Sequence, residues 1–289
     1  MSFEFGLTPS LGLKTAQYYR RPNVSDTPVY LDDPLGELRV WPVRIFTFGR
    51  FEIFRANEPL RFSREVQRRA LLLLKAILAF GGQQVSEARL VALMWPGAQG
   101  DVARLCLNRT VYRLRRLLGV RDSVVPQDNR ISLDARYVWV DAWVVEQLLQ
   151  RAEQYVTRES LDPLARCMAT AVTLYRGPFL HEEQGVSWGQ PYAHRLRRRL
   201  LGELFRIGRQ LELNEREEDA LHCYDQCLAI DPCAENVCRQ LMSLYHRLGR
   251  LADALLVYRH CHNALIQQSG VSSSPQTQAL LKELTAGET

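Results

Sequence analysis

Residues 101–119 read DVARLCLNRTVYRLRRLLG, and this stretch decides the predicted fold of the first half of the chain. Apolar residues recur there every three or four positions, which is the spacing of one face of an α-helix. Five of them form a stripe that we expect to face a domain core: Ala103, Leu107, Val111, Leu114 and Leu118. We expect Asp101 to cap this helix and Gly119 to end it.

The opposite face of this helix holds residue types that read DNA. Guanidinium groups can bind guanine edges in the major groove, and an asparagine amide can bind adenine. Six such candidates gather on or beside this face: Asn108, Arg109, Thr110, Tyr112, Arg113 and Arg116. Arg104 and Arg115 lie toward its edge, where we expect phosphate contacts. The alternative is a charged face that only meets solvent.

The flanking sequence predicts small strands around two further helices. Alternating apolar residues indicate strands over 43–54, with residues 57–59 as a turn. A helix is expected after Ser63 and should end at Gly81 and Gly82, and a second should be capped by the Ser86 hydroxyl. Residues 124–133 predict a hairpin, followed by a strand over 137–140. Strands, three helices and a hairpin predict a winged helix-turn-helix over residues 41–140. Arg130, at the hairpin tip, would enter the minor groove, or is simply an exposed turn residue.

Residues 141–289 read as helical throughout and contain a repeat. Asp219-Ala220-Leu221 recurs as Asp253-Ala254-Leu255, 34 residues later. Other pairs share that spacing: Leu211 and Tyr245, Arg216 and Arg250, Tyr224 and Tyr258, and Cys227 and Cys261. A 34-residue period is typical of tetratricopeptide helix pairs. The expected fold class is therefore mainly α with small β-sheets, a winged helix followed by an all-α tetratricopeptide-like domain.

The formal net charge of +5 over 289 residues is unevenly distributed. Counting Lys and Arg against Asp and Glu gives −1 for residues 1–40, +9 for 41–140 and −3 for 141–289. A basic middle segment fits contact with a polyanion. Residues 1–40 contain Pro and Gly without a periodic pattern, so we expect a flexible arm there.

Other functions find less support in the sequence. We expect no metal, because Cys223, Cys227, Cys233 and Cys238 contain no CxxC pair and buried thiols explain them better. No catalytic motif or cofactor-binding motif is found, so we expect no catalytic residues, no cofactor and no enzyme activity. Without a signal peptide or an apolar run of about 20 residues, we expect a cytoplasmic protein with no membrane partner.

Several stretches resemble known regulators. Residues 43–54, 68–80, 85–96 and 108–119 resemble an OmpR-type winged helix, with 108–119 matching its recognition helix. Residues 137–141, 174–180 and 270–275, together with Trp188, are similar to a bacterial transcriptional activator domain. The combination, over about residues 43–284, resembles the antibiotic-regulatory-protein class of activators. Leu105 and Cys106 depart from it, since related proteins often carry more polar groups there.

The resemblance implies a transcriptional activator that binds direct repeats in promoter DNA and contacts RNA polymerase subunits. It implies that Arg109 and Arg113 read bases and that Thr110 and Arg115 contact the DNA backbone. The helical domain is a candidate for homodimerisation or for sensing a small effector. The basic run at residues 195–199 could bind an acidic partner or a phosphorylated small effector, or is simply a solvated helix face. The alternative function is an interaction adaptor or effector-binding regulator with secondary DNA affinity.

Overall fold

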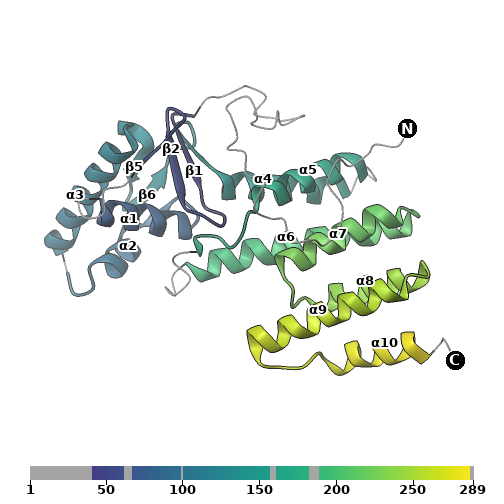
Figure 1. The fold of residues 1–289 in the computed structure, drawn as a ribbon. Helices are drawn as coiled ribbons and strands as arrows, with labels where there is room; N and C mark the ends of the chain where they lie inside the picture. The colour runs from purple at the N-terminus through teal and green to yellow at the C-terminus, as the bar shows by residue number, and fades with distance from the viewer. Residues whose placement is uncertain (1–40, 62–66, 99, 157–160, 182–188, 287–289) are drawn as a thin grey trace. The chain divides into compact units, whose positions relative to one another are not determined.

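The computed structural model describes residues 41–61, 67–98, 100–156, 161–181 and 189–286 (Figure 1). The predicted arm at residues 1–40 lies outside these ranges, as do Ser63 and Trp188.

A four-stranded sheet begins the described chain. β1 (Val43–Phe46) pairs antiparallel with β2 (Glu52–Arg55), and β2 pairs with the short β3 (Glu58–Pro59). β7 (Val138–Val140) joins the other side of β1 in parallel, so the order is β3-β2-β1-β7. The predicted turn at residues 57–59 is partly wrong. Ala56 and Asn57 make the turn, both with positive φ, and the two residues after them already pair with β2.

Three helices follow this hairpin: α1 (Arg68–Ala79), α2 (Glu87–Met94) and α3 (Gly100–Leu118). Gly81 and Gly82 have positive φ and follow the end of α1, as predicted. The two predicted caps are confirmed only in part. Ser86, the last residue of β4 (Val85–Ser86), is the N-cap residue of α2 as expected, but its hydroxyl makes no capping hydrogen bond. Asp101 lies inside the first turn of α3 rather than before it.

The predicted hairpin is present. β5 (Val124–Gln127) and β6 (Arg130–Leu133) pair antiparallel, after a short 3₁₀ turn at Arg121–Ser123. Asp128 and Asn129 form the two-residue turn with φ of 52° and 57°, as a type I′ turn requires. β4 pairs with the other side of β6, giving a second sheet of order β4-β6-β5. The hairpin is the wing of a winged helix.

Seven helices make up the rest of the described chain: α4 (Asp141–Val156), α5 (Leu161–Leu174), α6 (Gln190–Leu213), α7 (Glu217–Ile230), α8 (Glu235–Arg247), α9 (Leu251–Ser269) and α10 (Pro275–Ala286). Figure 1 shows them running back and forth one after another, and α6 packs on α7 as α8 packs on α9. None of the described helices combines the length and apolar character needed to span a bilayer.

The 34-residue repeat has a structural counterpart. Ala220 and Ala254 are both fully buried, so a small side chain lets adjacent helices approach closely at each site. Arg216 donates from Nε to Asp219 at 2.8 Å, and Arg250 donates to Asp253 at the same distance. Each arginine precedes its helix, α7 or α9, so both repeats begin with the same ion pair.

The helical part is joined to the first sheet through a buried carboxylate. Asp141, the first residue of α4, accepts the backbone N–H of Thr47 at 2.8 and 2.9 Å and its hydroxyl at 2.5 Å. It also accepts the backbone N–H of Phe48 at 3.2 Å. The Phe48 backbone pairs with that of Phe179, beyond α5. Burial raises the pKa of Asp141 to about 6.

Candidate nucleic-acid interface

Helix α3 is held against the core by its apolar face. All five residues of the predicted stripe are buried, and they are Ala103, Leu107, Val111, Leu114 and Leu118. The last four of them share a core with Leu73, Leu74 and Ile77 of α1. Burying one full face fixes the rotation of α3 about its own axis, so the opposite face is presented outward.

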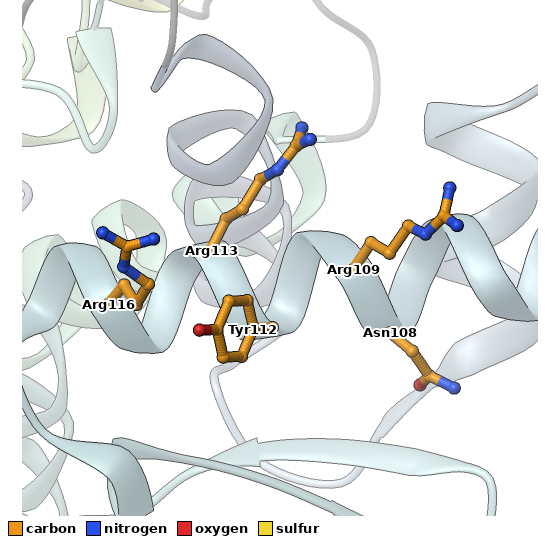
Figure 2. A pocket seen from close by; sticks show the side chains of 5 residues that line it. All are labelled: Asn108, Arg109, Tyr112, Arg113 and Arg116. Atoms are coloured by element: carbon orange, nitrogen blue, oxygen red, sulfur yellow. The ribbon is translucent and has the colours of Figure 1, made fainter.

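The outward face of α3 brings together most of the predicted DNA-binding residues. Five of them line a shallow recess along the helix: Asn108, Arg109, Tyr112, Arg113 and Arg116. Figure 2 shows the three arginine side chains extending to one side of the helix, with the Tyr112 ring between Arg113 and Arg109 along the axis. All five residues are exposed. The surface is therefore basic and contains hydrogen-bond donors, an amide and an aromatic ring.

The arginines of this face are free to bind a ligand. Within the described ranges, no hydrogen bond or ion pair engages the side chains of Arg109, Arg113 and Arg116. The same holds for Arg104, which is exposed near the start of α3. By contrast, Arg199 of α6 pairs with Glu153 at 2.9 Å. Uncompensated positive charge on one exposed helix face favours an anionic partner.

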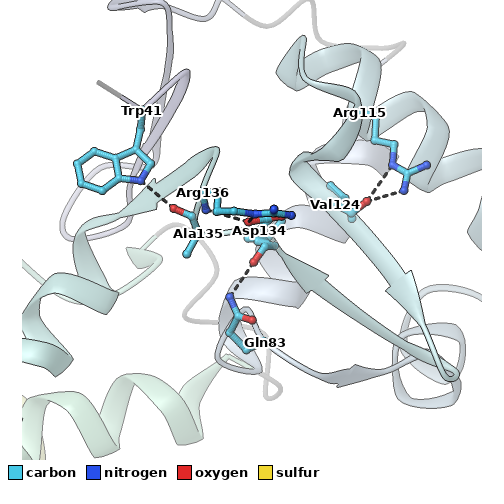
Figure 3. A network of polar contacts seen from close by, with 8 residues as sticks. Trp41, Gln83, Arg115, Val124, Asp134, Ala135 and Arg136 are labelled. Carbon is cyan, nitrogen blue, oxygen red and sulfur yellow. Dashed lines mark hydrogen bonds and ion pairs between the residues drawn. The ribbon is translucent and has the colours of Figure 1, made fainter. Parts of the chain in front are cut away.

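Two predicted site residues are placed differently. Thr110 is 3% exposed, and its hydroxyl donates to the carbonyl of Cys106 at 2.8 Å, so its side chain belongs to the buried side of α3. Arg115 is half-buried and donates to the carbonyl of Val124 from two nitrogens, at 2.9 and 2.6 Å (Figure 3). Arg115 therefore ties α3 to the wing, and neither side chain joins the exposed basic face.

The predicted wing residue begins β6. Arg130 is exposed and donates from its guanidinium to the carbonyl of Gln84 at 2.9 Å. The neighbouring Gln83 donates to the carbonyl of Leu133 at 2.7 Å (Figure 3). These contacts fix the hairpin against the segment that precedes α2. Arg130 is thus held at the base of the turn rather than extended from its tip.

Two apolar residues on α3 were not among the candidates. Val102 is 64% exposed and Leu105 is 50% exposed, although both are large and apolar. The core stripe accounts for neither residue. A helical wheel that tracks the side opposite the core would have identified both, since they are three positions apart and Leu105 precedes Arg109 by four.

The cysteines form no metal site in the described part of the chain. All seven are free thiols, and no three His, Cys, Asp or Glu side chains gather as metal ligands among the described residues. Burial raises the pKa of Cys223 to about 12. Cys227 and Cys261, equivalent in the repeat, are both buried. They pack as small apolar side chains between helices.

Comparison with known proteins identifies the helical part of the chain. Residues 140–285 match the bacterial transcriptional activator domain. The chain belongs to this family. Its members are transcription regulators rather than enzymes, and the match confirms the resemblance to the antibiotic-regulatory-protein class of activators.

One sequence relative and one solved structure match both the winged helix and the helical part of the chain. The chain is 26% identical over 257 residues to "Regulatory protein AfsR" of Streptomyces griseus, covering 84% of the chain and 24% of that protein. Its fold is similar to that of EmbR of Mycobacterium tuberculosis, solved in complex with a low-affinity phosphopeptide. The TM-score is 0.60 at 18% identity, covering 85% of this chain and 65% of EmbR. The chain thus spans about a quarter of AfsR and under two thirds of EmbR. The predicted fold class, a winged helix followed by a tetratricopeptide-like helical domain, is confirmed.

Proposed function

We propose that this chain is a sequence-specific DNA-binding transcriptional activator that docks α3 in the major groove. The observation that carries the proposal is the exposed face of α3, where three arginines without partners among the described residues stand opposite a buried apolar stripe. A recognition helix needs both faces, because one anchors it rigidly and the other meets base edges. The family supports the second half of the proposal, that binding activates transcription.

The chemistry of each side chain assigns its role on DNA. Arg109 and Arg113 have exposed guanidinium groups near the middle of α3 and are suited to guanine edges. Asn108 is suited to adenine. Arg104 and Arg116 lie toward the two ends of α3, where phosphate contacts would set its orientation. Arg130 and Tyr112 complete the proposed surface, while Thr110 and Arg115 support it from within.

Different segments of the chain would have different functions. Residues 41–140 would bind DNA and residues 141–289 would contact RNA polymerase at promoters that carry direct repeats, with residues 1–40 as a preceding arm. Homodimerisation and a small effector are further proposals for the helical domain. The charge distribution supports the division, since the first of these parts is strongly basic and the second is weakly acidic.

Removing two base-reading side chains tests the proposal. The full chain first selects a duplex from a random pool. A variant with Arg109 and Arg113 both changed to Ala should bind that duplex at least about tenfold more weakly, since a bidentate base contact contributes roughly 1–3 kcal/mol. The matched control changes Arg166 and Arg259 to Ala, because both are exposed and lie on α5 and α9. It removes the same charge and should bind the duplex like the wild type. Fluorescence anisotropy measures the affinities.

Salt dependence separates the proposal from the adaptor alternative. Binding to the duplex should weaken steeply as salt rises, because each phosphate contact adds about 0.9 to the slope of log K against log salt. If the Arg109/Arg113 variant binds the duplex with the same affinity as the wild type, α3 is not the helix that reads the bases. Salt-insensitive binding of peptides without any affinity for DNA would support the adaptor instead.

A further inference from the structure

The outward side of α3 is not uniformly polar. Residues 102, 105, 109, 112 and 116 are three or four positions apart and form one stripe along the exposed face. Its first two members are Val102 and Leu105, which are 64% and 50% exposed. Tyr112 is 62% exposed on the same stripe. Three of the eight large apolar residues exposed in the described chain therefore lie on this one helix.

The stripe has no structural use within the described chain. Val102 and Leu105 lie opposite the buried stripe, which already holds α3 on the core. The arginine that follows them, Arg109, has no partner among the described residues. A second copy of this chain is a poor occupant, since a symmetric contact would bring the arginine rows of both copies together. The charge of the face points to an anionic partner that also offers apolar groups.

DNA offers such a group in the major groove. Among the base edges exposed there, thymine presents a C5-methyl group, and apolar side chains contact it. The N-terminal residues of a recognition helix are those that reach the base edges. Val102 and Leu105 occupy the first half of α3. Val102 lies two turns before Arg109, and Leu105 lies one turn before it.

We propose that Val102 and Leu105 recognise the C5-methyl groups of thymines next to the base that Arg109 reads. The inference rests on the proposed function and makes it more specific, because it assigns a thymine-containing half to the bound sequence. It also accounts for the apolar residue at position 105, where the resemblance leads one to expect a polar group.

Replacing thymine with deoxyuridine tests this inference directly, since only the methyl group is lost. The full chain first selects duplexes from a random pool, and each thymine of the selected site is then replaced in turn. At one or two positions, deoxyuridine should weaken wild-type binding about three- to fivefold, as expected for one buried methyl group. A variant with Val102→Ala and Leu105→Ala should bind the thymine and deoxyuridine duplexes equally at those positions.

An exposed leucine outside α3 provides the control. Leu213 of α6 is 70% exposed, and Leu213→Ala should keep the full preference for thymine. The inference is overturned if the wild type binds every deoxyuridine duplex as well as its thymine parent. It is also overturned if the Val102/Leu105 variant keeps the preference. A pool that yields no sequence bound better than random duplex overturns the proposed function itself, which is a distinct result.

Discussion

Arg113 and Arg115 are chemically identical residues two positions apart on α3, yet their surroundings give them different roles. The guanidinium of Arg115 donates two hydrogen bonds to the carbonyl of Val124, which begins β5. The guanidinium of Arg113 is exposed and has no partner within the described residues. One arginine therefore contributes to the stability of the winged helix, and the other remains available for a ligand.

Alanine substitutions at these two positions should affect different properties, stability at Arg115 and DNA binding at Arg113. Arg115→Ala leaves the buried Val124 carbonyl without these donors, so we expect the free energy of unfolding to fall by about 1.5–3 kcal/mol. Arg113→Ala should change it by less than about 0.5 kcal/mol, as is usual for an exposed residue, while weakening DNA binding. Urea denaturation of both variants measures the difference. Equal stability of the two variants would contradict the role assigned to Arg115.

At the scale of elements, the pairing of α6 with α7 depends on one glycine. A Cβ atom at Gly208 would lie 2.5 Å from the ring of Tyr224, which is fully buried on α7. The Tyr224 hydroxyl in turn donates to Glu212 at 2.8 Å. Glu212 also accepts from Gln240 and Arg247 of α8, so it links three consecutive helices. The stacking of the helical domain relies on this close approach.

Gly208→Ala should therefore destabilise the protein. We expect a loss of about 1–3 kcal/mol in the free energy of unfolding, because the added methyl group cannot fit without moving the tyrosine ring. Gly202 lies on the same helix with open space where its Cβ would be. Gly202→Ala is the matched control and should stabilise the protein by up to about 1 kcal/mol, the helix propensity difference. Thermal denaturation that shows the same shift for both would refute the packing argument.

At the scale of the whole described molecule, the winged helix and the helical domain share a buried polar contact. Asp141 is 1% exposed and accepts hydrogen bonds from Thr47 and Phe48, which follow β1. Trp143 of α4 donates to the carbonyl of Gly81 at 3.0 Å, and a Cβ at Gly82 would lie 2.4 Å from the Trp143 ring. The two parts thus meet through specific backbone contacts at the start of α4.

The buried carboxylate makes this contact sensitive to pH. The pKa of Asp141 is raised from 3.8 to about 6 by burial, so the folded state favours the protonated form more than the unfolded state does. Protonation of Asp141 therefore stabilises the folded state. This contribution is complete below the pKa that Asp141 has in the unfolded chain, and it is lost as pH rises through about 6. We compare the free energy of unfolding of the wild type with that of an Asp141→Asn variant. The wild-type value minus the variant value should fall by at most about 3 kcal/mol between pH 4 and pH 7.

Denaturant titrations across this pH range measure that difference. Asp225 has a pKa raised to about 6 by burial as well, but it is present in both proteins and its contribution cancels. A difference that stays constant with pH, or that grows as pH rises, would contradict the assignment to Asp141.

Local pattern alone determined the type and order of most elements. The apolar stripe of α3, the hairpin at residues 124–133 and the 34-residue spacing were all readable, since each reflects a periodicity or a backbone preference within a short segment. The arginine face of α3 followed from the same periodicity. The Asp101 cap was misplaced, and the Ser86 hydroxyl makes no capping bond although Ser86 is the N-cap residue, because helix ends depend on what packs around them.

Only the tertiary structure decided which polar side chains face outward. Thr110 and Arg115 share a helix with the exposed arginines, but the core covers the first and the Val124 carbonyl binds the second. The burial of Asp141 was equally hidden. A sequence specifies which groups a chain carries, whereas the partners of each group come from segments far away along the chain, and those partners exist only after folding.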